Sequence, residues 1–404
     1  MQAAHGHSKV ASALPSPPLP PGTHAAISAL LPITEFTHFH RDPNINYQLN
    51  RFLIPGSQDL FVELGSKIRD FEDWKSEFLS AAGSSERRGE LAQAAGLYRA
   101  AEFFMSPSDP DRRRAFEKFI ELFYSTHRDR HLERIAVPYE GSHLHGLRLD
   151  PEAAPRGTIV IHAGYDAYVE EFYGLAQVMA LCGYQVIMFD GPGQGSTLMR
   201  DNVAMTPDWE KPVGAVLDYL ELSEVTLIGI SLGGCLALRA AAFEPRVKRV
   251  VAFDVMLDFF QCITSRRGRA AEIALTTLVG LRLGGLINLM ARAMMKRDLM
   301  SRWGIEQGMH VLGAATPAEF FFKLKTYHTR SISQRITQHA LIMAGAEDHF
   351  VPLAQLFDQL PLLENARSVT AQIFTRAEQA QSHCQIGNLG LAVTQIIGWV
   401  DSHS

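Results

Sequence analysis

Cysteine is scarce in this chain, and none of it forms a metal or redox motif. The 404 residues include four cysteines, Cys182, Cys235, Cys262 and Cys384, and no two of them form a CxxC pair. Such pairs mark zinc sites and thiol–disulfide motifs, so neither is expected. We predict no metal and no cofactor. The residues before Pro15 lack the apolar core of a secretory leader, so we expect a reducing, cytoplasmic setting.

The chain also lacks a long run of charges of one sign. The chain has 38 Lys and Arg against 43 Asp and Glu, a net charge of −5. A nucleic-acid partner is therefore not expected. Apolar residues make up 47% of the chain, enough for a substantial core and too many for a wholly disordered protein.

An uninterrupted apolar run long enough to cross a bilayer is absent too. The most apolar long stretch, Ile273–Met295, is broken by charged, polar and glycine residues: Arg282, Asn288, Arg292 and glycines 280, 284 and 285. A spanning helix needs about 20 apolar residues without such charges. We therefore predict no membrane span and interpret the stretch as part of a helical cap over an apolar pocket.

The order of local patterns predicts how the chain is divided. Prolines crowd the first residues, whereas residues 32–131 have helical periodicity and no strand signal. From residue 132, short apolar runs alternate with helical stretches. The expected parts are a disordered tail over 1–31, an N-terminal helical lid region over 32–131, a first core part over 132–254, an inserted helical cap over 255–335 and a second core part over 336–404.

Eight short runs are candidate strands. They are Glu133–Tyr139, Leu144–Leu149, Gly157–His162, Gln185–Phe189, Val225–Ile230, Val247–Phe253, His339–Ala344 and Val369–Phe374. Several of them are continuously apolar, which is typical of parallel strands buried on both faces. Helical stretches between them favour a mostly parallel sheet flanked by helices, with right-handed crossovers.

The strongest catalytic signal is the sequence Gly229-Ile230-Ser231-Leu232-Gly233. It follows the apolar run VTLIGI and precedes the helical stretch CLALRAAAF. A strand, a sharp turn and a helix are the context in which GxSxG presents a nucleophilic serine. Glycines two positions before and after remove side chains that would collide at such a turn. This motif makes the α/β-hydrolase fold, with an N-terminal helical region and an inserted cap, the predicted fold class.

A serine nucleophile needs a histidine base and an acid, and in this fold they follow it in the order Ser, acid, His. Asp348 lies just after the run HALIMAG, with Glu347 beside it as a competitor and Asp358 as a more distant one. His383 follows the last strand and precedes the closing helix. We predict Ser231, Asp348 and His383 as the catalytic residues.

Two backbone amides should stabilise the oxyanion. The residue after the nucleophile, Leu232, should supply one amide, and the loop after the run TIVIH should supply the other. We favour the amide of Tyr165, with Asp166 as the alternative. The nearby loop Asp190–Gly195 lacks the residues of a phosphate-binding loop, so we interpret it as structural.

Four segments together resemble fungal secondary-metabolite α/β-hydrolases, the fusarin-type and polyketide-shortening pigment hydrolases. They are GISLGG, DGPGQG, HAGYDAYVEE and AQSHCQIGN, and HFHRDPNINYQLNRF near the N-terminus is also similar to those proteins. The resemblance covers residue 34 to the C-terminus. It implies a Ser231–Asp348–His383 triad, a helical lid and a substrate made by a polyketide or polyketide–peptide synthase, with ring formation as an alternative to net hydrolysis.

Two other functions compete with this expectation: a general carboxylesterase or peptidase of the same fold, and a binding protein without turnover. The intact Ser, acid and His disfavour the second. A peptidase should carry acidic lid residues, whereas the cap is basic, with Arg266, Arg267, Arg269, Arg282, Arg292, Lys296 and Arg297. Those cations suit an apolar, anionic or carrier-linked substrate, or else form a solvated helix face. The substrate-binding residues, the exact bond and the oligomeric state are left open.

Overall fold

The computed structural model describes residues 19, 22–265 and 268–404, which are arranged around one eight-stranded sheet. The strands are β1 (Leu132–Tyr139), β2 (Ser142–Leu149), β3 (Thr158–His162), β4 (Gln185–Asp190), β5 (Val225–Ile230), β6 (Val247–Phe253), β7 (His339–Gly345) and β8 (Ser368–Phe374). Their order across the sheet is β1-β2-β4-β3-β5-β6-β7-β8. β2 pairs antiparallel with both β1 and β4, and the other pairs are parallel. All eight predicted strands and the predicted α/β fold class are therefore confirmed.

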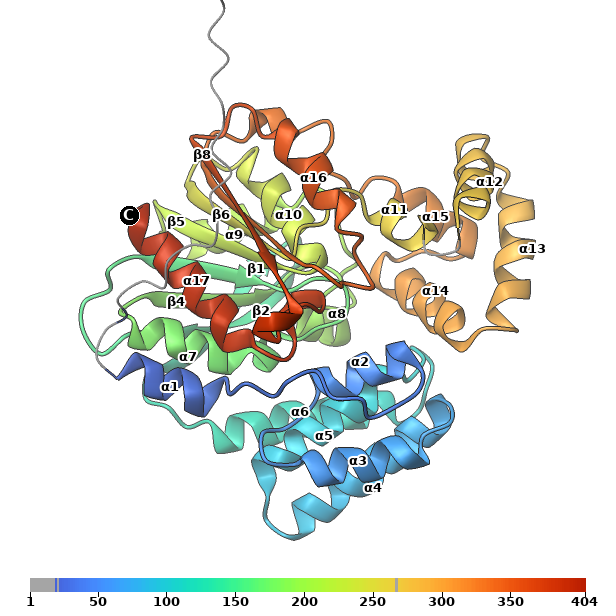
Figure 1. Ribbon diagram of the computed structural model, residues 1–404, viewed down its shortest axis with the longest axis horizontal. Helices are drawn as coiled ribbons and strands as arrows, with labels where there is room; N and C mark the ends of the chain where they lie inside the picture. Colours follow the sequence, from blue (N-terminus) through green and yellow to red (C-terminus); the bar gives the residue numbers. More distant parts are fainter. Residues whose placement is uncertain (1–18, 20–21, 266–267) are drawn as a thin grey trace, which may run out of the picture.

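Helices cover both faces of this sheet, because its central strands are apolar on both sides (Figure 1). The core helices are α7 (Tyr173–Leu181), α8 (Gly195–Asp201), α9 (Glu210–Tyr219), α10 (Leu232–Ala241), α16 (Ala354–Gln359) and α17 (Leu389–Ser402). One core cluster joins α9 and α10 to one face, and a second joins α7 and α17 to the other. Short 3-10 helices also occur: η1 (Val169–Phe172), η3 (Ser333–Arg335), η4 (Leu360–Leu362), η5 (Arg376–Glu378) and η6 (His383–Gln385).

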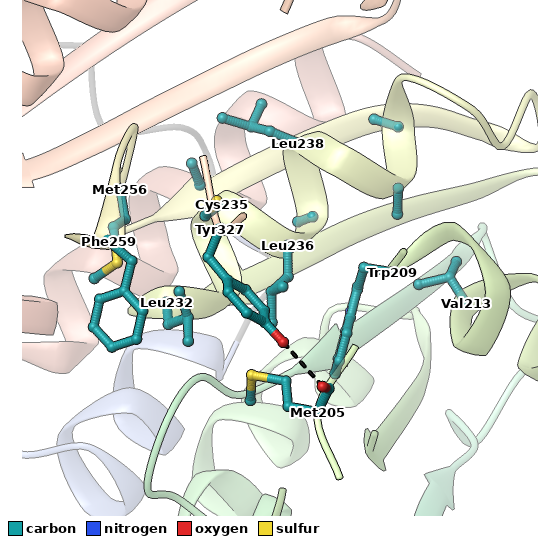
Figure 2. Close-up of a cluster of buried hydrophobic side chains, with 14 of the residues drawn as sticks. Met205, Trp209, Val213, Leu232, Cys235, Leu236, Leu238, Met256, Phe259 and Tyr327 are labelled. Atoms are coloured by element: carbon teal, nitrogen blue, oxygen red, sulfur yellow. Dashed lines mark hydrogen bonds between the residues drawn. The ribbon is translucent and has the colours of Figure 1, made fainter. Parts of the chain in front are cut away.

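Figure 2 shows the core around α10, the helix that follows the GxSxG turn. Leu232, Cys235 and Leu236 of α10 are buried there together with Trp209. The hydroxyl of Tyr327 donates a hydrogen bond of 2.9 Å to the carbonyl of Met205. The helix that presents the candidate nucleophile thus packs in one core with side chains from two other parts of the chain, around residues 205–209 and at Tyr327.

The N-terminal region precedes the sheet and has its own apolar core. Its helices are α1 (Thr23–Leu30), α2 (Pro43–Arg51), α3 (Gln58–Lys67), α4 (Phe71–Arg87), α5 (Leu91–Phe103) and α6 (Arg112–Thr126). Trp74 and Phe78 are fully buried at the centre of this core. Phe116, Phe119 and Phe123 of α6 instead join the cluster on the α7–α17 face of the sheet. The helical region is therefore anchored to the sheet by α6.

The prediction of an unstructured tail over residues 1–31 is wrong for Thr23–Leu30, which form α1. Ile27 and Leu30 of this helix pack against the second core cluster, next to α7. Tertiary packing, which the local sequence does not reveal, therefore stabilises this short helix. Residues 1–18, 20 and 21 lie outside the described residues.

A run of helices separates β6 from β7. They are α11 (Phe259–Thr264), α12 (Arg269–Gly280), α13 (Gly284–Met295), α14 (Leu299–Val311) and α15 (Pro317–Leu324). The indole N–H of Trp303 in α14 donates to the carbonyl of Phe103 in α5 at 2.9 Å, and the two rings lie 4.9 Å apart. The inserted helices and the N-terminal helices thus contact each other directly. In the described part of the chain, no helix has the length and apolar character needed to cross a membrane.

We predict that the sheet needs the N-terminal helices to form a soluble and active protein. Removing residues 34–131 would expose the sheet-side contacts of Phe116, Phe119 and Phe123, and it would delete the buried core around Trp74. The shortened protein should be insoluble or inactive, as judged by its soluble fraction and its activity. A soluble and fully active deletion would show that this segment is an independent module.

Candidate active site

Ser231 lies on a strained turn between β5 and α10. Its backbone has φ 61° and ψ −124°, a conformation that a residue with a side chain rarely adopts. A Cβ at Gly229 would come within 1.9 Å of the carbonyl oxygen of Gly233, so only glycine fits there. The strain lifts the serine out of the regular strand and helix and turns its hydroxyl towards a cavity.

Ser231, His383 and Asp348 form one hydrogen-bonded series. The Nε2 of His383 lies 2.8 Å from the Ser231 Oγ, and its Nδ1 lies 2.5 Å from the Asp348 Oδ2. The other Asp348 oxygen accepts hydrogen bonds from the amides of Phe350 and Val351 at 2.7 and 2.9 Å. The carboxylate is therefore held in one orientation against the imidazole.

The charged forms of Asp348 and His383 stabilise each other. Burial disfavours the charged form of Asp348, yet the adjacent His383 holds the pKa of that carboxyl below its usual value. Burial likewise opposes protonation of His383, but the adjacent Asp348 carboxylate raises the pKa of the imidazole well above its usual value. The geometry thus stabilises an imidazolium that forms when the ring takes up a proton.

The carboxylate of Glu347, the alternative to Asp348, points away from His383. It pairs with the guanidinium of Arg376 on the surface. Neighbouring side chains in this loop diverge, so only one of the two acids reaches His383. Asp358, the more distant alternative, lies on α16 near Arg330.

The candidate oxyanion loop approaches Leu232 at this turn. Gly164 packs so closely on the start of α10 that a Cβ there would lie 2.8 Å from the Leu232 nitrogen. The side-chain amide of Gln194 donates to the carbonyls of Ala163 and Gly164 at 2.6 and 2.9 Å. In a trans peptide the N–H points opposite to the C=O, so the Tyr165 N–H points away from Gln194. The loop Asp190–Gly195 therefore orients the candidate oxyanion loop and has the structural role expected for it.

Ion pairs that are buried or partly buried connect the candidate oxyanion loop to the N-terminal helices. Arg51 of α2 pairs with Asp166 at 2.8 Å and with Glu171 at 3.0 Å. Arg99 of α5 pairs with Glu171 at 2.8 Å and donates to the carbonyl of Asp166 at 2.5 Å. Burial disfavours the charged form of Glu171, but Arg51 and Arg99 hold the pKa of that carboxyl below its usual value. Sequence reasoning missed both arginines, because nothing local links them to residue 166.

A second carboxylate near His383 was also missed. Asp254 follows β6 and is fully buried, and its Oδ2 lies 3.4 Å from the His383 Nδ1. Its two oxygens accept hydrogen bonds of 2.8 Å from the Cys384 amide and from the Gln385 side chain. Burial raises the pKa of Asp254, and the hydrogen bond with His383 opposes that rise. The only available signal was its position at the end of a predicted strand.

Tyr47 supports the histidine from the N-terminal region. Its hydroxyl donates to the His383 carbonyl at 3.1 Å, and its ring centre lies 6.2 Å from that of the imidazole. Tyr47 belongs to α2, within the N-terminal segment that resembles the fungal hydrolases. His383 is therefore held in part by a side chain that lies 336 positions earlier in the sequence.

A cavity of about 630 Å³ opens at Ser231 and His383. One side is polar and comes from α2, with Asn44, Tyr47, Gln48 and Arg51. The other side is apolar and comes mainly from the inserted helices, with Met256, Phe259, Ile263, Met294, Met300, Trp303, Phe320 and Phe321. The basic residues of the cap, for which substrate contact and a solvated helix face were both open, are exposed and do not line this cavity, in so far as the structure describes them: Arg269, Arg282, Arg292, Lys296 and Arg297. Of the two readings of those cations, the solvated helix face holds. Arg266 and Arg267 lie outside the described residues.

Three residues around the candidate base make a poor metal site. Asp254, His383 and Cys384 bring three donor atoms within 4.8 Å of one another. The imidazole already bonds Ser231 and Asp348, and burial raises the pKa of the Cys384 thiol. A metal would need a thiolate and a nitrogen lone pair, so this donor set suits proton transfer better than metal binding.

The comparisons with known proteins identify the family. The model of the alpha/beta hydrolase fold family matches residues 157–369. This chain belongs to that family. It is 30% identical over 299 residues to the hydrolase acrC of Aspergillus aculeatus, covering 65% of this chain and 68% of acrC. It is 28% identical to the 20-hydroxy-prefusarin hydrolase FUS2 of Gibberella moniliformis, covering 80% and 83% of the two chains.

The fold is shared with solved structures as well. Wild-type AbyA5 superposes with a TM-score of 0.64 at 17% identity, over 85% of this chain and 90% of AbyA5. The resemblance to fungal secondary-metabolite α/β-hydrolases is confirmed. The α/β-hydrolase is thus an enzyme related to hydrolases of fungal secondary metabolism.

We predict that Asp254 tunes the histidine. Asp254→Asn removes a carboxylate from the vicinity of Nδ1, so the pKa of His383 should fall and the acid limb of the kcat/KM profile should move to lower pH. An Asn has one accepting oxygen for two donors, so the maximal rate should also fall about tenfold. The measurement is kcat/KM against pH on a soluble ester.

The surface variant Asp358→Asn serves as the matched control and should leave the profile unchanged. An unshifted acid limb in Asp254→Asn would show that Asp254 exerts no electrostatic effect on His383.

Proposed function

We propose that this α/β-hydrolase is a serine hydrolase acting on a polyketide or polyketide–peptide intermediate. Ser231 is the nucleophile, His383 the general base and acid, and Asp348 the residue that orients the imidazole. The observation that carries the proposal is the series of two hydrogen bonds from Asp348 through His383 to Ser231, opening onto a large cavity.

The reaction begins with proton transfer from the Ser231 hydroxyl to the His383 Nε2. The Ser231 oxygen attacks the substrate carbonyl, and the amides of Leu232 and Tyr165 stabilise the resulting oxyanion. His383 then returns the proton to the leaving alcohol, thiol or carbon, and an acyl-enzyme remains. Water resolves it to a free acid, and a hydroxyl of the substrate itself would resolve it to a ring.

The cavity lining supports a substrate with one polar and one apolar end. The inserted helices contribute methionine and aromatic side chains, which suit a long unsaturated or alkyl chain. Helix α2 contributes amide, phenol and guanidinium groups, which suit oxygen-rich groups. FUS2, whose name gives 20-hydroxy-prefusarin as its substrate, is similar to this chain over most of both lengths.

A general carboxylesterase or peptidase is the alternative function. An exopeptidase needs an acidic side chain that can bind the substrate amine. Two of the acids that line the cavity, Asp166 and Glu171, are already paired with Arg51. The pairing favours an uncharged substrate over an amine, and the size of the cavity favours a larger molecule than a simple ester.

We predict that Ser231→Ala folds normally and loses at least about 10³-fold in turnover, as expected when a triad nucleophile is removed. A fluorophosphonate should label Ser231 in the unmodified protein, as located by mass spectrometry of peptides. Metabolite profiles of a producing strain without this gene should reveal an accumulated intermediate, which the purified protein converts and Ser231→Ala does not. Label on another residue, or an undiminished rate in Ser231→Ala, would rule out the serine mechanism.

The role of the acid can be tested with a matched pair of variants. Asp348→Asn should cost about 10³–10⁴ in rate, because the imidazole loses the carboxylate that fixes its tautomer. Glu347→Gln should cost less than about tenfold, because it breaks only a surface ion pair with Arg376. Both rates are measured on one substrate, with thermal melting as the check on folding. The reverse order of effects would assign the role to Glu347.

A further inference from the structure

Exposed large apolar side chains are concentrated on α12, α13, the turn that joins them and the start of α14. Seven of the twelve exposed large apolar residues in the described part of the chain lie between residues 273 and 299: Ile273, Leu281, Leu283, Leu286, Leu289, Met290 and Leu299. Leu281 and Leu289 are the most exposed of them, at 65% and 67%. Apolar side chains exposed in such number within one short segment are typical of a binding face.

The arrangement on α13 is that of an amphipathic helix with an apolar outer face. Leu286, Leu289 and Met290 have the three- and four-residue spacing that places side chains on one side of a helix. Ile287 and Ala291 are buried on the inner side, against the neighbouring cap helices. Figure 1 shows α12 and α13 at the edge of the molecule, far from α1 and β1. Their outer face thus belongs to neither the core nor the catalytic cavity.

The same segment is rich in cations. Residues 269–297 contain five Lys or Arg and one acid, Glu272, in a chain whose net charge is −5. All five cations, Arg269, Arg282, Arg292, Lys296 and Arg297, are exposed. The segment therefore combines apolar side chains that protrude with positive charge beside them.

We propose that the outer face of α12 and α13 docks on an anionic membrane surface, with the two helices lying in the plane of the headgroups. Each helix has 12 residues, about 18 Å, and so lies on a bilayer without spanning it. Leucines and methionine enter the headgroup boundary while Lys and Arg contact anionic lipid headgroups. A second copy of this chain docked face to face would oppose five cations to five cations, so charge favours lipid.

The position of the face also connects it to the cavity. Met294 near the end of α13 and Met300 of α14 line the cavity next to the exposed residues of the same segment. A lipophilic substrate dissolved in a membrane would therefore be released near the apolar side of the cavity. The docking itself does not depend on the proposed chemistry, because none of the seven exposed residues lines the cavity.

The test is sedimentation of the full-length chain with vesicles of phosphatidylcholine alone, or of phosphatidylcholine mixed with phosphatidylserine. Binding to the anionic vesicles should be at least about tenfold stronger and should weaken in high salt. Leu286→Asp with Leu289→Asp should reduce binding at least about tenfold, and so should Arg292→Glu with Arg297→Glu. Val62→Asp with Leu181→Asp, two equally exposed apolar side chains on α3 and α7, is the matched control and should change nothing.

Fluorophosphonate labelling and thermal melting verify that each variant is folded. No preference of the wild-type chain for anionic vesicles would overturn the proposal. A wild-type dimer that binds no vesicles and becomes a monomer in Leu286→Asp with Leu289→Asp would assign the face to a second copy instead.

Discussion

The buried and partly buried ion pairs of Arg51 and Arg99 are the interaction on which the arrangement of this site depends. They join two N-terminal helices to Asp166 and Glu171, next to the loop that faces the start of α10. Arg99 is only 2% exposed, so breaking one pair would leave an uncompensated charge in the interior. Pairs of this kind add little net stability, yet losing one partner is costly because the other charge stays behind. They link α2 and α5 to the loop that faces the start of α10.

The sequence alone predicts the strands and the three residues of the series, because each of these features is local. A continuous apolar run identifies each strand, and the turn chemistry around Ser231 has few alternatives. Asp348 and His383 follow from their place after the last strands, since the carboxyl ends of parallel strands meet at one edge of the sheet. Their roles as catalytic residues stay predictions.

Other parts of the site come from tertiary contacts that no local pattern indicates. Asp254 and Tyr47 both lie next to His383, although these two residues are about half the chain apart from each other. No spacing rule in the sequence connects either of them to His383. The sequence left the role of the cap cations open between substrate contact and a solvated face, because it does not tell which face of a helix turns inward. Helix α1 was missed for a related reason, since its stability comes from packing against α7.

The hydrogen bond from Tyr47 to the carbonyl of His383 spans 336 positions of the chain. A ribosome releases the N-terminal helices first, and they have an apolar core of their own around Trp74. The segment that carries His383 is made long after the segment that carries Tyr47. The apolar core of the N-terminal helices can therefore form before His383 exists, whereas the contact between Tyr47 and His383 needs both segments. The hydrogen bond that holds the His383 backbone thus also ties an early-made segment of the chain to a late-made one.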